Sequence, residues 1–207
     1  MDKRPPKRSD GLRTISKIVE FAAKELDEVG AVQFNLDRVI EKSGISRGSI
    51  YHHFGDREGL IVAVEISEIV QILTSGNERM RRLFTESQSG DEIIHGIETA
   101  IRAGIHGRGR NYRRRRIASL ATAQHSPAIA RALADVQVSE TDYWVETLRI
   151  GTEKGLIHPY EPVVGTADVI QSLLVGRILV DILDDDERDD SWVLGSIEVF
   201  RALLRPS

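Results

Sequence analysis

Apolar residues recur at steps of three and four along almost the whole chain, which is the spacing of one face of an α-helix. The first of these stripes consists of Ile15, Ile18, Val19, Ala22, Leu26 and Val29. It predicts a helix over about residues 11–29, and Gly30 follows in the position that a helix C-terminus favours. Strand signals are weak, with no sustained alternation of apolar and polar residues and no Asn-Gly turn. We therefore expect an all-α protein.

Three further helix starts follow closely. Asn35, Ser46 and Asp56 each stand where an N-cap residue is expected. The helices they predict span about residues 36–43, 46–53 and 56–75. Gly44 lies between the first two, and its freedom to adopt a left-handed backbone lets two short helices cross steeply, as in a helix-turn-helix. A helix of two turns is not stable alone in water, so we expect its neighbours to hold the 46–53 helix in place.

Beyond Gly76 the helical spacing continues, with less definite ends. We predict helices near residues 91–105, 112–124, 127–155, 163–184 and 190–204. The domains we expect are a basic flexible tail at residues 1–10, a helix-turn-helix domain at 11–57 and a larger C-terminal bundle at 58–207. The helix at 56–75 would connect the two domains.

The predicted 46–53 helix has one apolar and one polar side. The residues expected to form the small core that fixes its angle are Val39, Ile40, Ile45, Ile50 and Phe54. On or near the opposite side lie Arg47, Gly48, Ser49, Tyr51 and His52. A polar helix held by its back suits a DNA groove, and Gly48 would let the backbone come close to another surface.

The stretch AKELDEVGAVQFNLDRVIEKSGISRGSIYHHFGDREGL resembles the DNA-binding domain of TetR/AcrR-type transcriptional regulators. The matching positions are Gly30, Gly44, Ile45, Ser46, Gly48, Tyr51, His53 and Phe54, and the resemblance covers about residues 11–65. Three positions depart from the family pattern: Asn35 replaces Thr, Ile40 replaces a small Ala, and Arg57 replaces Lys. The resemblance implies an N-terminal three-helix DNA-binding domain and a C-terminal domain for ligand binding and dimerisation.

The resemblance also implies a set of DNA-binding residues: Asn35, Ser46, Arg47, Gly48, Ser49, Tyr51, His52 and Arg57. Among them we expect contacts to the DNA backbone, which position the protein, from Asn35, Tyr51, His52 and Arg57. Contacts to base edges are expected from Arg47 and Ser49, with Arg47 placed to bind guanine. The alternative is that Arg47 is a solvated charge and Tyr51 is half core. The basic tail would either lie along DNA or serve as a solubilising segment.

An arginine-rich run, HGRGRNYRRRRIAS, covers residues 106–119. Four consecutive arginines, residues 113–116, point to all sides of a helix, so at least one must approach the core. In one interpretation, one or two of them line a cavity and bind an anionic ligand such as a carboxylate or phosphate. In the other, which we favour, they pair with the acidic stretch at residues 184–190 or with another subunit. A second nucleic-acid surface is a third, less favoured alternative.

Family resemblance implies a small, mostly apolar ligand inside the C-terminal bundle, and such pockets are apolar with a few placed polar groups. The candidates for ligand binding are Tyr112, Arg113, Arg116, Tyr143 and Trp144. Aromatic residues at helical spacing are more often plain core, so each carries that alternative.

The last two predicted helices have wide apolar faces. These comprise Val169, Leu173, Leu174, Ile178, Leu179 and Ile182 on one, and Val193, Ile197, Phe200, Leu203 and Leu204 on the other. So much apolar surface on a terminal pair predicts a two-fold four-helix interface, and the family dimerises through the corresponding helices. We therefore expect a homodimer through helices at about 163–184 and 190–204.

The composition of the chain limits the classes of protein to which it can belong. The chain has 207 residues with 41% apolar, which is ample for a core, and it has no cysteine, which excludes disulfides and thiolate chemistry. No metal-ligand cluster, phosphate-binding glycine loop or catalytic arrangement is visible, so we expect no cofactor, no metal and no enzymatic activity. The N-terminus lacks an apolar signal segment and no apolar run approaches about 18 residues, which favours a cytoplasmic protein without a membrane partner.

The net charge of −4 does not by itself indicate a nucleic-acid partner. A protein with this net charge can still have a locally basic surface. Taken together, the sequence predicts a homodimeric repressor that binds a palindromic double-stranded DNA operator and is released by a small-molecule effector. An activator of the same fold and a helical adaptor without DNA binding are the alternatives.

Overall fold

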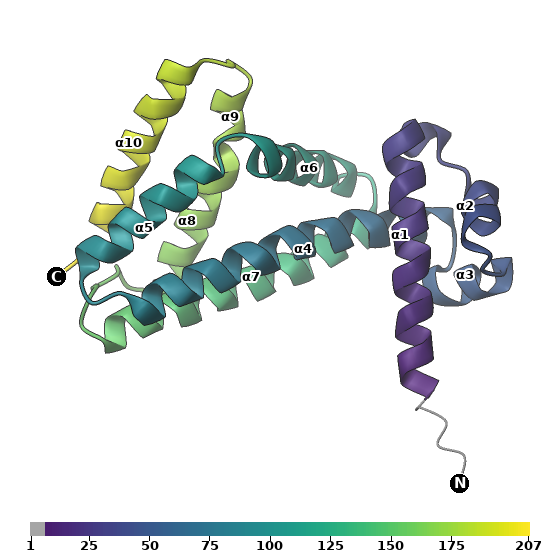
Figure 1. Ribbon diagram of the computed structural model, residues 1–207, viewed down its shortest axis with the longest axis horizontal. Coiled ribbons are helices and arrows are strands. Elements are labelled where there is room, and N and C mark those ends of the chain that lie inside the picture. Colours follow the sequence, from purple (N-terminus) through teal and green to yellow (C-terminus); the bar gives the residue numbers. More distant parts are fainter. Residues whose placement is uncertain (1–6) are drawn as a thin grey trace, which may run out of the picture.

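The computed structural model describes residues 7–207, which form ten helices and no strand beyond an isolated bridge between Ile157 and Pro206 (Figure 1). The helices are α1 (Lys7–Gln33), α2 (Leu36–Ser43), α3 (Arg47–Phe54), α4 (Arg57–Glu86), α5 (Gly90–Ala103), α6 (Gly107–Ala123), α7 (Pro127–Glu153), α8 (Val163–Gly176), α9 (Ile178–Asp181) and α10 (Asp186–Leu204). The all-α prediction is confirmed. Residues 1–6 of the predicted tail lie outside the described residues, and residues 7–10 belong to α1.

The first three helices form a small bundle at one end of the molecule, closed by the start of α4 (Figure 1). Its core contains Ile18 and Ala22 from α1, Val39 from α2, Ile50 from α3 and Leu60 from α4, all fully buried. The other residues predicted for this core, Ile40, Ile45 and Phe54, are partly buried against it. The predicted core of the helix-turn-helix is therefore confirmed.

The capping interactions expected from the sequence are formed. The distances are 2.8 Å from Asn35 Oδ1 to Asp37 N, 3.3 Å from Ser46 Oγ to Ser49 N and 2.8 Å from Asp56 Oδ1 to Gly59 N. Gly44 has φ 68°, a left-handed conformation that is strained for other residues, and it ends α2 so that α3 can begin at a new angle. Gly30, at φ 73° and ψ 167°, interrupts the helical backbone of α1 near its predicted end.

The long helices α4 and α7 lie side by side and run in the same direction (Figure 1). Near the N-terminal bundle, Val62 and Ile69 of α4 pack with Ile129 and Leu133 of α7. The main core lies at the far ends of α4 and α7, where these helices meet α5, α8 and α10. Its fully buried members include Phe84, Ile93, Leu148, Ile170 and Val193. Helix α4 thus contributes to all three apolar clusters and mechanically joins the two parts of the chain.

Several predicted helix boundaries differ from the structure: α1 spans Lys7–Gln33 instead of about 11–29, α6 begins at Gly107 instead of near 112, and three further differences have a clear physical reason. Helix α4 continues through Gly76 to Glu86, because contacts with α7 stabilise it beyond the point where propensity alone predicts an end. The predicted helix at 163–184 is broken after Gly176, a residue that weakens helices. Helix α10 starts early because Asp185 Oδ1 accepts from the backbone N–H groups of Glu187 and Arg188 at 3.0 and 3.2 Å.

On the last helix, the residues that we predicted to form the dimer interface lie on the wrong side of the helix. Val193, Ile197, Phe200 and Leu204 are buried in the main core of their own chain. The exposed apolar residues of this region are instead Val164, Val169, Leu179, Ile182, Leu183, Leu194 and Val199. They come from α8, α10 and the α9 segment, so an apolar surface remains, one position away from the predicted face of α10.

We expected no segment to be long and apolar enough for a membrane helix. Judged by length and composition alone, this expectation is wrong. Two segments, Arg57–Glu86 and Val163–Asp181, pass that test. The test is weak evidence, because core helices of soluble proteins pass it as well. Helix α4 contributes side chains to all three apolar clusters, and 28% of its apolar window is buried.

Candidate nucleic-acid interface and effector cavity

Helix α3 presents one side to the core and the other to solvent. Ile50 is fully buried, whereas Arg47, Gly48, Tyr51 and His52 are exposed. A Cβ placed on Gly48 would meet no atom within 4 Å, so the backbone at this position faces open space. Because Ser46 caps the helix and Gly44 sets its angle, Arg47, Gly48, Tyr51 and His52 lie on the exposed side of α3.

Arg47 is bound to Asp37, an exposed acidic residue of α2. The Asp37 carboxylate raises the pKa of Arg47 above its ordinary value, and a hydrogen bond with Tyr51 acts in the same direction. The guanidinium is therefore charged but engaged within the protein. Such an exposed pair is worth little and separates readily when a stronger partner approaches.

Two of the predicted backbone-contacting residues also have structural roles. Arg57 Nε donates to the carbonyl of Phe34 at 3.2 Å, and its guanidinium lies 5.6 Å from the centre of the Phe34 ring. Arg57 therefore fastens the start of α4 to the α1–α2 connection while remaining exposed. Asn35 caps α2 and is likewise exposed. Ser49, which we predicted to contact base edges, is half-buried.

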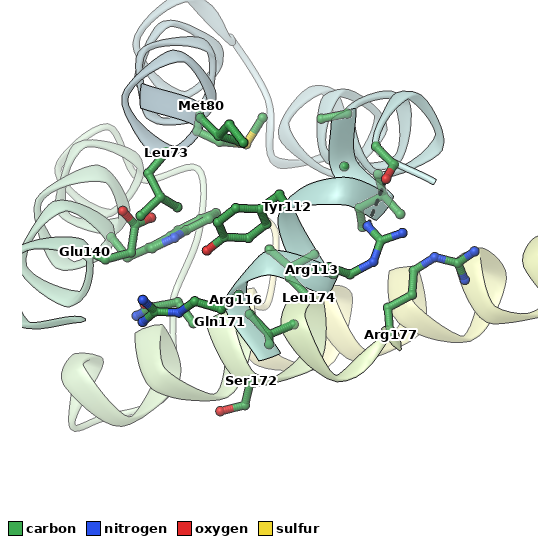
Figure 2. A pocket seen from close by; sticks show the side chains of 18 of the residues that line it. Leu73, Met80, Tyr112, Arg113, Arg116, Glu140, Gln171, Ser172, Leu174 and Arg177 are labelled. Carbon is green, nitrogen blue, oxygen red and sulfur yellow. Dashed lines mark hydrogen bonds between the residues drawn. The ribbon is translucent and has the colours of Figure 1, made fainter. Parts of the chain in front are cut away.

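A cavity of about 760 Å³ lies inside the C-terminal bundle. Its walls come from α4, α5, α6, α7, α8 and α10, and apolar side chains such as Leu73, Met80 and Leu174 form much of the lining (Figure 2). Of the five ligand-binding candidates, Tyr112, Arg113, Arg116 and Trp144 line it, and Tyr143 does not. The Tyr143 hydroxyl instead donates to the carbonyl of Asn77 on α4.

Arg113 is buried and satisfied. Its Nε and Nη2 bind both oxygens of Asp181 at 2.5 and 2.8 Å, and its Nη groups donate to the carbonyls of Gly104 and Ile105, each at 2.8 Å. Arg110 similarly pairs with Asp184 at 2.8 Å. These contacts support the interpretation that arginines of the run pair within the chain, although Asp181 precedes the acidic stretch we named.

Arg116 differs from its neighbours. It is 5% exposed and its Nη2 donates to Gln137 Oε1 at 2.8 Å, but its buried Nη1 has no hydrogen-bond partner. In Figure 2, Arg116 lies with Gln171 and Glu140 toward one end of the cavity, whereas Arg113 and Arg177 lie toward the other. One arginine of the run therefore lines the cavity without a paired carboxylate.

Sequence reasoning missed the polar residues of α7 and α8 that surround Arg116. Glu140 Oε2 accepts from Asn77 Nδ2 at 2.9 Å, and Gln137 Nε2 donates to Gln171 Oε1 at 2.7 Å. A usable signal was present, because Gln137, Glu140 and Trp144 follow each other at steps of three and four within an otherwise core-facing helix. Their spacing places them on one face, but only the fold shows that this face borders a cavity.

Burial raises the pKa of Glu140, more than the hydrogen bond from Asn77 and the charge of Arg116 lower it. Because its pKa is higher in the folded state than in the unfolded state, Glu140 stabilises the fold at low pH, where it is protonated. That stability is lost as pH rises above about 4.5, the ordinary value, through the folded pKa. Glu140→Gln removes the titrating group and keeps an acceptor oxygen. We expect the melting temperature of the variant, relative to wild type, to be higher at pH 8 than at pH 5.

Thermal unfolding of both proteins at the two pH values measures this difference. The matched control is Glu146→Gln, an exposed position on the same helix that pairs with Arg149. It should leave the pH dependence nearly unchanged. An equal offset for Glu140→Gln at pH 5 and pH 8 would contradict the assigned direction.

Arg115, adjacent to Arg116 on α6, points elsewhere and joins three helices. Its Nη2 lies 2.9 Å from Asp27 Oδ1 of α1, and its Nη1 binds Glu68 of α4. Successive residues of a helix point about 100° apart, so one segment of α6 faces the cavity through Arg116 and contacts α1 and α4 through Arg115.

One group of possible metal ligands was also missed by the sequence. His106, Asp186 and Asp189 bring ligand atoms within 4.8 Å of one another where α6 begins near α10. Asp189 already binds the buried guanidinium of Arg177. Its charge is thereby compensated, which makes the group a poor cation site.

Comparison with known proteins places the chain among bacterial regulators. A family model described as bacterial regulatory proteins, tetR family, matches residues 18–64. The HTH-type transcriptional regulator UidR of Escherichia coli K12 is 24% identical over 195 residues, which cover 94% of each chain. These relatives belong to a class of regulators and not to a class of enzymes.

Solved structures show the same fold. Salmonella enterica GusR is 18% identical with a TM-score of 0.66, and the match covers 94% of this chain and 96% of that one. A TetR-family transcriptional regulator from Cytophaga hutchinsonii is 15% identical with a TM-score of 0.66, covering 99% and 100% of the two chains.

Proposed function

The chain is a TetR-family helix-turn-helix transcriptional regulator, and from this premise we propose that it is a ligand-responsive repressor. In this proposal the DNA-binding domain comprises residues 11–57, and residues 58–207 bind the effector and form the dimer. The observation that carries the proposal is the exposed polar face of α3, whose opposite side is anchored through fully buried Ile50. We further propose a cytoplasmic location, where a regulator reaches chromosomal DNA.

The proposed DNA contacts divide by role. Arg47 and Ser49 read base edges, with Arg47 directed at guanine N7 and O6. Tyr51, His52, Asn35 and Arg57 bind the phosphate backbone, while Ser46 caps α3 and Gly48 allows close approach. Exposure of Arg47, Tyr51 and His52 on one face supports this assignment.

The proposed dimer uses the exposed apolar residues of α8, α9 and α10. Leu179 and Ile182 are 72% and 76% exposed, and Leu194 is 59% exposed. Apolar surface of this kind on a terminal pair of helices suits a two-fold interface. Two DNA-binding domains about one helical turn of DNA apart would then read the two halves of a palindromic operator.

Release by an effector requires that the ligand bind the conformation that does not fit DNA more tightly. Helix α4 lines the cavity through Leu73 and Met80 and also forms part of the DNA-binding bundle through Leu60. Arg115 gives α6 a second connection, to Asp27 and Glu68. A ligand that displaces α4 or α6 would therefore change the separation of the two DNA-binding domains.

The proposal is tested by selecting bound sequences from random double-stranded DNA with the full-length chain. We expect enrichment of an inverted repeat. Affinity for it should fall steeply with salt, because phosphate contacts release counterions. Absence of any enriched sequence, or binding insensitive to salt, would favour a protein-binding adaptor.

A smaller prediction concerns the Asp37–Arg47 pair. In the proposed complex Arg47 must leave Asp37 to reach DNA, and Asp37 itself repels phosphate. Asp37→Asn should therefore raise operator affinity about two- to fivefold, the range for loss of a competing surface pair. Titration of labelled operator measures this, with Asp91→Asn, an exposed pair partner of Arg201 far from α3, as control. Weaker operator binding by Asp37→Asn would mean that the pair pre-positions Arg47.

A further inference from the structure

Two buried guanidinium groups that line the cavity, those of Arg116 and Arg177, have nitrogens without a hydrogen-bond partner, and of these two only Arg177 has a salt bridge to a carboxylate. Arg116 is 5% exposed, its Nη1 is buried, and Nη1 has no hydrogen-bond partner. Its neighbour in space, Gln137, supplies an uncharged oxygen only. No carboxylate lies within 4.0 Å of the Arg116 nitrogens among the side chains that the structure describes. A buried guanidinium without a paired anion is unfavourable, and a bound anionic oxygen would relieve that cost.

The other buried arginines of the cavity are compensated by the chain itself. Arg113 binds both oxygens of Asp181. Arg177 pairs with Asp189, lies 3.4 Å from Asp181 through its Nε, and has its guanidinium 4.8 Å from the centre of the Trp192 ring. Among these buried arginines, Arg116 is therefore the one that has no carboxylate partner from the chain itself.

The residues around Arg116 determine which other chemical groups the ligand can have. Two carboxylates line the cavity: Glu140, whose Oε2 accepts from Asn77, and Asp168, whose Oδ1 accepts from Thr141 Oγ1. Burial raises the pKa of Glu140, and the hydrogen bond from Asn77 and the charge of Arg116 only partly offset that shift. Away from this end, Leu73, Met80 and Leu174 give the cavity an apolar wall. The ligand must therefore combine an apolar body with a single charged head.

We infer that the effector is an apolar molecule bearing one anionic oxygen group, such as a carboxylate, which binds Arg116 Nη1. This inference rests on the proposed function, because it names the class of molecule that enters the proposed effector cavity. A charge-assisted bond to Arg116 would pull on α6, the helix whose preceding residue, Arg115, binds α1 and α4. The same helix thus senses the anion and contacts the DNA-binding domain.

A matched pair of fluorescent probes tests the inference. 1-Anilinonaphthalene-8-sulfonate is an apolar anion, and N-phenyl-1-naphthylamine has the same skeleton without the sulfonate. Both are titrated into the full-length wild-type chain, into Arg116→Gln, and into the control Arg114→Gln. Arg114 is exposed, on the same helix, and does not line the cavity.

The expected result is that Arg116→Gln weakens binding of the sulfonate about tenfold or more, as loss of a charge-assisted hydrogen bond requires. Binding of the neutral probe should change less than about twofold. Arg114→Gln should affect neither probe. Unchanged sulfonate binding in folded Arg116→Gln, or an equal loss for both probes, overturns the inference.

Wild-type protein supplies a second measurement that does not depend on the folding of a variant. Decanoate should displace the neutral probe at lower concentration than 1-decanol, although the alcohol is the more apolar of the two. Equal or better displacement by 1-decanol overturns the anion inference. If neither probe binds wild type, the effector part of the proposed function fails with it. If both bind without regard to Arg116, only the anion inference fails.

Discussion

Replacing Asp181 with asparagine is expected to lower the free energy of unfolding by about 3 kcal/mol or more, the usual loss when one partner of a buried ion pair is removed. Asp181 is 2% exposed and binds Arg113 through two hydrogen bonds, and Arg177 lies 3.4 Å away. The asparagine fits the same space but carries no charge. Both buried guanidinium groups then lose a counter-ion while remaining shielded from water.

The matched control is Asp184→Asn. Asp184 also binds an arginine of α6, Arg110, at 2.8 Å, but its side chain is 81% exposed. Its removal should change stability by less than about 1 kcal/mol, as for other solvent-exposed pairs. Urea unfolding at one fixed protein concentration measures both variants, because dimerisation would make the midpoint depend on concentration.

A double variant separates the value of the pair from the penalty of breaking it. Arg113→Met combined with Asp181→Leu replaces both charges by apolar groups, a change that is often close to neutral in other proteins. We expect it to recover much of the stability that Asp181→Asn loses. If Asp181→Asn were no more destabilising than Asp184→Asn, the pair would not be the structural anchor of α6 that the geometry indicates.

The DNA-binding half was predictable because its signals are local. Asn35, Ser46 and Asp56 each cap a helix within three residues of themselves, and Gly44 sets a turn through its own backbone. The small core followed from the same short range, since Val39 and Ile50 lie on helices joined by a single turn. Local rules therefore sufficed for the fold of this part and for the exposed face of α3.

The C-terminal half was less predictable because its outcome depends on distant partners. Four arginines in a row carry no information about which one is paired. Arg113 meets Asp181, which lies 68 residues away, while Arg116 faces the cavity. The same holds for α10, where Val193 and Phe200 are buried and Leu194 and Val199 are exposed. Helical spacing showed that an apolar face exists, but not which neighbouring helix covers it.

Loss of operator binding is the second large effect, expected for Arg47→Ala and for Tyr51→Ala. Each should weaken binding to the selected operator about tenfold or more, and the double variant should retain only nonspecific affinity. Arg47 and Tyr51 are both exposed on α3, one helical turn apart. The control Arg149→Ala removes an exposed arginine of α7 that pairs with Glu146, and it should bind operator like wild type.

The two positions should differ in how binding is lost. A base-edge contact carries sequence information, so Arg47→Ala should relax the preference at one base pair in each half-site. Tyr51→Phe keeps the aromatic ring and removes only the hydroxyl. If Tyr51 contacts phosphate, this variant should bind all sequences uniformly more weakly while unfolding at the wild-type temperature. Wild-type affinity for Tyr51→Phe together with a lower melting temperature for Tyr51→Ala would instead identify Tyr51 as part of the core.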